Sequence, residues 1–236
     1  MLMNSEKKSQ SPSCASCQLK THARICFAEN GTGSKGCPTL TRKEILAQAN
    51  KEYDALHIRE FARQASIQEA ECYANRHERP YILQPTKTRL EEITEFAKKM
   101  GYRRLGLAFC IGLVKEAQLV EEIFAIQGFD VTSVVCKAGR TPKEKIDVKD
   151  DEKIFQGTDE SMCNPIFQAS LLNHEKTDFN ILLGLCVGHD SLFFKYAEAP
   201  TTVLAVKDRV TGHNPLAAVY LSNSYYQRVK KTDIRG

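Results

Sequence analysis

The chain has 236 residues, of which 42% are hydrophobic and 26% charged, a composition that is typical of a soluble globular protein and excludes extensive disorder. The formal net charge is only +4, and Lys and Arg alternate with Asp and Glu, so we expect no nucleic-acid partner. The opening residues, MLMNSEKKSQSPS, contain no apolar run, and no stretch reaches the length of a membrane helix. We therefore expect no membrane partner and a cytoplasmic location.

Nine cysteines are the most distinctive feature of the composition. A reducing compartment keeps thiols free, so cysteines there indicate metal ligation or catalysis more often than disulfides. An odd number also cannot be paired completely within one chain. The cysteines fall mainly into one group near the amino terminus and a second group in the later part of the chain.

The first group lies in residues 1–40, a predicted Cys-rich metal-binding segment with a CxxC pair followed by two wider spacings. Thiolates two residues apart can bind one ion, and no apolar periodicity is present to order the segment without it. Zinc and an iron–sulfur cluster fit equally, with His22 as a possible substitute ligand. The alternative is a mobile tail with redox-labile thiols. The candidate metal ligands are Cys14, Cys17, Cys26 and Cys37.

Residues 41–85 carry two stretches of helical periodicity and form a predicted helical segment. The second stretch runs from Ile58 to about Arg76 and includes Cys72, which we interpret as a small core residue. Two prolines in ERPYILQPT then interrupt the pattern and mark a domain boundary.

From residue 86 to 236 the pattern alternates between helix and strand. Thr88 and Glu91 form a capping box that predicts the start of a helix. Four short apolar runs follow, separated by helical stretches, and such runs predict parallel strands that are covered on both faces. The runs are RRLGLAFC, FDVTSVVC, FNILLGLC and TTVLAVKD. The predicted fold class is α/β, a Rossmann-like parallel sheet of about four or more strands with flanking helices, preceded by the small Cys-rich and helical segments.

Three of these apolar runs end in a cysteine, and a fourth cysteine, Cys163, precedes a helix that Asn164 is expected to cap. The carboxyl ends of parallel strands lie along one edge of a sheet, where ligands bind, so we expect these thiols to gather there. A helix amino end would also lower the pKa of Cys163. The alternative is that the cysteines serve as small packing residues. The candidate cofactor ligands are Cys110, Cys136, Cys163 and Cys186.

Other candidates surround these thiols in the sequence. His189 is a candidate base for a nearby thiol, and Asp190 is expected to cap the helix that follows it. Lys207 or Arg209 could hold an anionic substrate and Asp208 could orient them, or these residues form a solvated surface pair. The long charged loop between Cys136 and Cys163 is interpreted as a lid. The candidate catalytic residues are Cys186, His189, Cys163, Lys207 and Asp208.

Several stretches together resemble a cysteine-rich prokaryotic family of uncharacterised metal-binding proteins. They are RLEEITEFAKKMGYRRLGLAFCIGL, MCNP, GLCVGHDS and VKDRVTGHNPLAAVY, together with the amino-terminal cysteines. The resemblance extends over nearly the whole chain. It implies metal binding, but it implies no reaction and does not say which thiols hold the ion.

Three hypotheses follow. In the first, the sheet edge binds an iron–sulfur cluster or another thiophilic metal and the protein is a redox or metal-assisted enzyme. In the second, the only metal is structural and amino-terminal, and Cys186 or Cys163 is a nucleophile with His189 as its base. In the third, the protein is a non-catalytic metal-binding or sensing module. The first is preferred because convergent thiols suit a soft metal, while no GxGxxG or Walker sequence indicates a nucleotide. The substrate or redox partner and the oligomeric state stay open.

Overall fold

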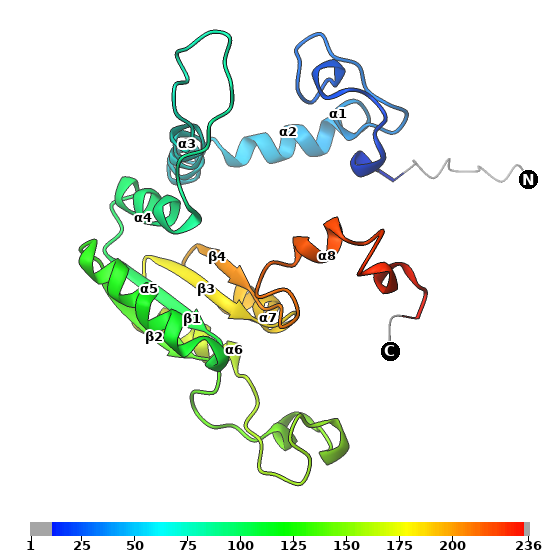
Figure 1. The fold of residues 1–236 in the computed structure, drawn as a ribbon. Helices are drawn as coiled ribbons and strands as arrows, with labels where there is room; N and C mark the ends of the chain where they lie inside the picture. The colour runs from blue at the N-terminus through cyan, green and yellow to red at the C-terminus, as the bar shows by residue number, and fades with distance from the viewer. Residues whose placement is uncertain (1–10, 234–236) are drawn as a thin grey trace, which may run out of the picture. The chain divides into compact units, whose positions relative to one another are not determined.

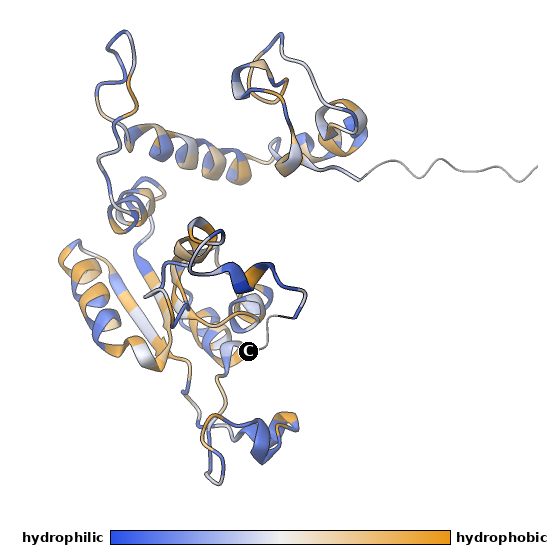
Figure 2. Ribbon diagram, turned by 45° about the vertical axis from the view of Figure 1, so that its right-hand side comes forward, coloured by the Kyte–Doolittle hydropathy of each residue, from blue (hydrophilic) through white to orange (hydrophobic). Residues whose placement is uncertain are grey.

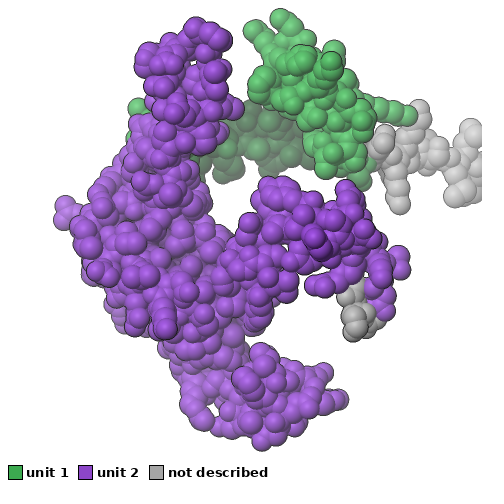
Figure 3. Space-filling model, in the orientation of Figure 1, with its two compact units in different colours: residues 1–67 green, residues 68–236 purple. Residues whose placement is uncertain are grey.

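The structure is a computed structural model that describes residues 11–233. The chain divides into two compact units, residues up to Ile67 and residues from Gln68 onward (Figure 3). The division falls within a helix. The three-part division into residues 1–40, 41–85 and 86–236 stays a prediction.

The first unit begins with an irregular segment and continues into helices (Figure 1). Pro38 is the first residue of a short helix, a position where its missing N–H is not needed. The helices of this unit, the last of which continues into the second unit, are α1 (Pro38–Thr41), α2 (Lys43–Glu52) and α3 (Leu56–Glu71).

Helix α3 ends earlier than its periodicity predicts, at Glu71 instead of near Arg76. The backbone beyond it forms other hydrogen bonds: the Thr86 N–H donates to the Cys72 carbonyl at 2.9 Å and the Ala74 N–H donates to the Gln84 carbonyl at 3.0 Å. The Cys72 carbonyl and the Ala74 N–H are both bonded to this loop, so neither is available for another helical turn. Cys72 itself is buried, as predicted for a small core residue.

The second unit is built on a four-stranded sheet in which all strands are parallel (Figure 1). The spatial order is β2-β1-β3-β4. Short apolar runs between helices form this sheet because both faces of each strand can be buried. The predicted α/β fold is therefore confirmed. The strands are β1 (Arg104–Phe109), β2 (Asp130–Val135), β3 (Phe179–Leu185) and β4 (Thr201–Val206).

Helices cover both faces of the sheet. The chain steps from β1 outward to β2 and then back across to β3, so right-handed connections place α5 on one face and α6 and α7 on the other. On the first face the Lys98 ammonium at the end of α4 donates to the Gln127 amide that caps α5, at 2.7 Å. The helices of this unit are α4 (Arg89–Lys99), α5 (Val114–Ile126), α6 (Pro165–His174), α7 (His189–Tyr196) and α8 (Leu216–Tyr220).

The core lies around the two central strands. Every residue of β3 is buried, and the inward residues of β1 are fully buried. Gly106 of β1 allows close packing, because a methyl group there would lie 2.2 Å from the Asn180 side-chain oxygen.

A capping box begins α4 as predicted: the Thr88 hydroxyl accepts from the Glu91 N–H, and the Glu91 carboxylate accepts from the Thr88 N–H. Within residues 11–233, no helix combines the length and apolar character that crossing a bilayer requires.

Candidate functional site

Side chains that can react follow the carboxyl end of every strand in the sheet. Cys136 is the first residue after β2, Cys110 the first after β1, Cys186 the first after β3 and Lys207 the first after β4. Because the strand order is β2-β1-β3-β4, these four residues follow one another along one edge. The edge lies beyond the carboxyl ends of parallel strands, where open α/β sheets bind ligands.

The middle of this edge is a topological switch point. The helix after β1 and the helix after β3 lie on opposite faces of the sheet, so the loops after Cys110 and Cys186 diverge. Gly184 permits the irregular end of β3, since its φ is +70° and a methyl group there would lie 2.2 Å from Leu113 Cδ1. A crevice between diverging loops is the usual position of a ligand in this class of fold.

Three of the thiols form a hydrogen-bonded row. The Cys163 Sγ lies 3.6 Å from the Cys136 Sγ, and the Cys136 thiol also contacts the Cys110 thiol. The Ile111 N–H donates to the Cys136 sulfur at 3.4 Å, and the Gly112 N–H donates to the Cys110 sulfur. Sulfur atoms from two strand ends and one helix start are therefore in direct contact.

The three thiols of this row differ in acidity. The hydrogen bond from Cys136, together with the Gly112 N–H and the Lys207 ammonium, lowers the pKa of Cys110 to about 5. The hydrogen bonds from Cys136 and then His189 lower the pKa of Cys163 to about 4. The same contacts and burial raise the pKa of Cys136. Cys136 therefore keeps its proton, and its single S–H group can stabilise only one of the two neighbouring thiolates at a time.

Three basic side chains contact the thiols, His189 from the start of α7 and Lys207 and Arg209 from the loop after β4. His189, the first residue of α7, hydrogen-bonds to Cys163, and that contact raises the pKa of the imidazole. Lys207 lies beside the Cys110 loop, with its Nζ 3.2 Å from the position that a Gly112 methyl would take. The Arg209 guanidinium donates to the Cys186 sulfur at 3.3 Å. The described side-chain partner of Cys186 is therefore Arg209. No hydrogen bond described in residues 11–233 links Cys186 directly to the three-thiol row.

Two acidic candidates have other contacts. The Asp208 carboxylate accepts from the N–H groups of Val210 and Thr211, both at 2.9 Å, so its described hydrogen bonds lie within its own loop. Asp190 was expected to cap α7, and this expectation is wrong: the cap lies two residues earlier, at Gly188, which has a φ of 85°. Glycine adopts a positive φ more readily than aspartate, so it is favoured at this cap position.

The other predicted cap is confirmed, because the Asn164 side chain accepts from the Phe167 N–H at 3.0 Å.

The loop of residues 137–161 is held together by its own charges. Glu160 is buried, and its carboxylate contacts the Lys143 ammonium at 2.8 Å and accepts from the Ile154 and Phe155 N–H groups. The lysine lowers the pKa of Glu160. The Lys137 ammonium donates to the Ser161 carbonyl and so links the two ends of the loop beside the thiols. The loop is mostly hydrophilic (Figure 2), and its role as a lid stays a prediction.

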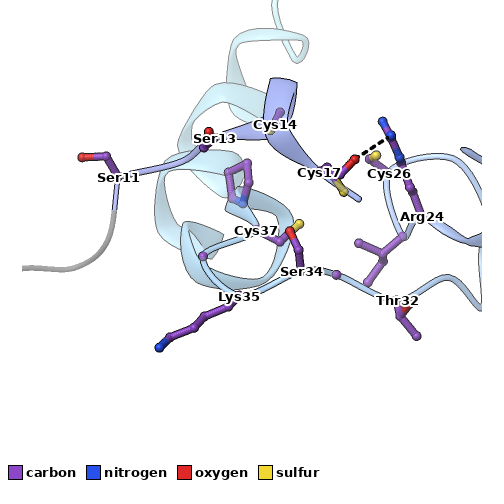
Figure 4. A pocket seen from close by; sticks show the side chains of 14 residues that line it. Ser11, Ser13, Cys14, Cys17, Arg24, Cys26, Thr32, Ser34, Lys35 and Cys37 are labelled. Atoms are coloured by element: carbon purple, nitrogen blue, oxygen red, sulfur yellow. Dashed lines mark hydrogen bonds between the residues drawn. The ribbon is translucent and has the colours of Figure 1, made fainter. Parts of the chain in front are cut away.

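The amino-terminal cysteines line one cavity of about 70 Å³ in the first unit (Figure 4). Arg24 organises its wall by donating to the carbonyls of Leu19 and Cys17. The Leu19 backbone N–H lowers the pKa of Cys17. Gly33 is needed because a methyl group there would lie 3.0 Å from the Cys37 Cβ. His22 does not line this cavity. The cysteines that do are Cys14, Cys17, Cys26 and Cys37.

As the side chains stand, no group of three or more His, Cys, Asp or Glu residues in the described part of the chain is arranged to hold a metal ion. The side chains of either group would therefore have to rearrange before one ion could be bound. The sequence predicted the thiols of the site but not the backbone N–H groups of Ile111 and Gly112 that donate to them. A pattern of side chains does not show where backbone N–H groups point. The glycine in CIG was the only available signal for them.

The fold and the site define an α/β protein with thiols along the carboxyl edge of its parallel sheet. Residues 37–204 match the family described as protein of unknown function (DUF1847), and this chain belongs to that family. It is also 47% identical over 213 residues to an uncharacterised protein of Methanocaldococcus jannaschii, covering 90% of this chain and 95% of that relative. No solved structure matches. The resemblance to an uncharacterised family is confirmed, and these matches name no metal, substrate or reaction.

Proposed function

We propose that this protein binds a thiophilic metal centre, an iron–sulfur cluster or zinc, and that the thiol-lined edge is its active site for redox or metal-assisted catalysis. One observation supports this more than any other: sulfurs of Cys110, Cys136 and Cys163 contact one another at the carboxyl edge of a parallel sheet. Separate packing cysteines have no reason to converge at the edge where this class of fold binds ligands.

The donor set fits such a centre chemically. Thiolates are the ligands that zinc and iron–sulfur clusters prefer, and the polar contacts at the edge already favour the thiolate forms of Cys110 and Cys163. In this proposal Cys110, Cys136, Cys163 and Cys186 hold the centre at the edge. The cavity in the first unit offers a second, structural site for Cys14, Cys17, Cys26 and Cys37.

The chain's own residues would supply substrate binding and proton transfer. A bound iron–sulfur centre would provide electron transfer, and bound zinc would provide a Lewis acid. Lys207 and Arg209 place two positive charges beside the thiols and so suit an anionic substrate. His189 contacts Cys163 and can hold or release a proton there.

Anaerobic purification tests the proposal. The full chain is expected to contain iron with sulfide and absorb in the visible range, or to contain zinc and stay colourless. Replacing the four edge cysteines with Ser should remove the metal of the edge, and replacing the four amino-terminal cysteines should remove the metal of the first unit. Cys72→Ser is the matched control, because Cys72 is a buried cysteine whose thiol contacts Gln68 and Glu92.

Two results would contradict the proposal. If the purified protein holds no metal under any of these conditions, metal binding is wrong. If the edge variant keeps its metal content, fold and cellular phenotype, the edge cysteines are packing residues. The protein is then a non-catalytic metal-binding or sensing module.

A second candidate function is thiol catalysis with Cys163 as nucleophile and His189 as its base. The contact between these two side chains favours it, and it favours Cys163 over Cys186, whose sulfur instead faces Arg209. A colourless protein in which iodoacetamide modifies Cys163 much faster than Cys186, with loss of that difference in His189→Gln, would support it. Equal and slow modification of both thiols would rule it out.

A further inference from the structure

We propose that Cys136 and Cys163 form a redox-active dithiol that closes into a disulfide on reaction with a small organic disulfide, with Cys163 as the attacking sulfur and Cys136 as the resolving sulfur. The inference rests on the proposed function only in assigning chemistry to the same edge of the sheet. It adds a specific pair, an order of attack and a class of substrate.

The geometry of the pair suits a disulfide. The two Sγ atoms are 3.6 Å apart, and a disulfide bond of about 2.05 Å would require them to approach by about 1.5 Å. The two backbones are already joined, because the N–H of Asn164, next to Cys163, donates to the Cys136 carbonyl at 2.8 Å. Rotation of the two side chains can therefore supply most of the remaining movement.

The different exposure of Cys136 and Cys163 determines which sulfur attacks and which one resolves. Cys136 is only 2% exposed, so a dissolved disulfide cannot reach its sulfur. Cys163 is half-buried and therefore the more accessible of the two, so it meets the reagent first. The His189 side chain hydrogen-bonds to Cys163, so a base that can take its proton lies beside the attacking sulfur. Cys136 then reacts only with a sulfur delivered beside it, which is the property of a resolving cysteine.

The reaction proceeds in two exchanges. The Cys163 thiolate attacks one sulfur of R–S–S–R and forms a mixed disulfide as the S–S bond of the reagent breaks. The first RS⁻ leaves and takes the proton held by His189. Cys136 then attacks the Cys163 sulfur of the mixed disulfide, and a second RS⁻ leaves with the Cys136 proton. Overall two thiols lose two electrons and two protons to form one disulfide, and R–S–S–R is reduced to two RSH.

Cys110, the third thiol of the row, is a competing partner for Cys136 and can be compared with Cys163. Cys110 also contacts Cys136, but it is only 7% exposed. A reagent from solution should therefore enter through Cys163. The first product is expected to be the Cys136–Cys163 disulfide and not the Cys110–Cys136 disulfide.

The test treats the full-length protein, purified anaerobically and freed of metal by chelation, with glutathione disulfide. Acid quenching, alkylation and tryptic peptide mapping then identify each product. Trypsin separates the thiols of the edge, because cleavage after Lys and Arg leaves Cys110, Cys136, Cys163 and Cys186 on residues 105–115, 116–137, 154–176 and 177–195.

We expect residues 116–137 and 154–176 to be recovered as one disulfide-linked species in the wild-type protein. Cys136→Ser should stop at a stable mixed disulfide of Cys163 with glutathione. Cys163→Ser should slow any reaction of the edge thiols at least tenfold. Cys72→Ser, the matched control, should behave like the wild type, and circular dichroism shows whether each variant is folded.

Recovery of the wild-type protein with a persistent mixed disulfide at Cys163, or with a different disulfide pair at the edge, would overturn the inference. This result does not depend on whether the variants fold. It is also separate from the proposed metal binding: the metal content of the protein before chelation tests the metal proposal, and the disulfide formed after chelation tests the dithiol, so either can fail without the other.

Discussion

At the scale of single residues, Cys136 determines the charge of the candidate site. Its thiol lies between the sulfurs of Cys110 and Cys163 and can donate its proton to either, so its own pKa is raised while theirs are lowered. A buried row of three thiolates would be strongly destabilised by charge repulsion. One retained proton, with Lys207 and His189 at the ends of the row, removes much of this repulsion.

Gly184 is the residue whose replacement should disturb this row most directly. Gly184→Ala adds a methyl group 2.2 Å from Leu113 Cδ1 at a φ of +70°, so both crowding and backbone strain should destabilise the fold, by about 2 to 5 kcal/mol. Gly101→Ala is a matched control, since Gly101 has the same φ of +70° and no atom within 4 Å. It should cost only about 1 to 2 kcal/mol. Urea unfolding measures both values, and equal losses would show that the contact with Leu113 is unimportant.

At the scale of elements, the start of α6 positions Cys163. Asn164→Ala removes the acceptor for the Phe167 N–H, so we expect a loss of about 1 kcal/mol in the free energy of unfolding. Asn164→Asp should keep most of this stability, because a carboxylate accepts the same hydrogen bond and interacts favourably with the helix dipole. Denaturant unfolding of the three proteins checks the order. An Asp variant as unstable as the Ala variant would show that the cap is not responsible.

The loop of residues 137–161 should respond to acid through Glu160. Its pKa is lowered in the folded protein, chiefly by Lys143, so the ionised carboxylate stabilises the loop above its ordinary pKa of 4.5. This stabilisation is lost as the pH falls from 4.5 through the lowered value. The protection of the Ile154 and Phe155 amides against hydrogen exchange, measured relative to their intrinsic exchange rates, should then fall, because both N–H groups donate to Glu160.

Glu160→Gln is the control for this pH effect. The amide cannot ionise, so exchange at the same two N–H groups should depend on pH only through the intrinsic chemistry of exchange. A wild-type loop whose protection is constant from pH 6 to pH 3 would contradict the assignment of Glu160 as the group that organises it.

At the scale of the whole molecule, the two units should respond differently to loss of metal. The second unit has a buried sheet that needs no ion, whereas no residue of the cysteine segment from Cys14 to Cys37 is buried. If the proposed amino-terminal centre exists, chelation should therefore increase hydrogen exchange in residues 14–37 and leave β1 and β3 protected. Loss of protection in the strands as well would show that the fold of the second unit also depends on a metal.

Much of the second unit could be predicted from local patterns. The capping box at Thr88, the Asn164 cap and the four apolar runs each act through neighbouring residues, so their effects are readable along the chain. The Asp190 cap could not be predicted correctly. Gly188 takes that position because of its positive φ, and a backbone angle is set by the surrounding packing.

The candidate site shows the same division between local and long-range information. Sequence alone determined that thiols follow strand ends and that parallel strands would bring those ends to one edge, because strand direction and alternation with helices are local properties. Only the tertiary structure decided which sulfurs touch. The contact of Cys163 with Cys136, and that of Arg209 with Cys186, join residues 27 and 23 positions apart, and such contacts depend on strand order and loop path. These are set by the packing of the whole unit.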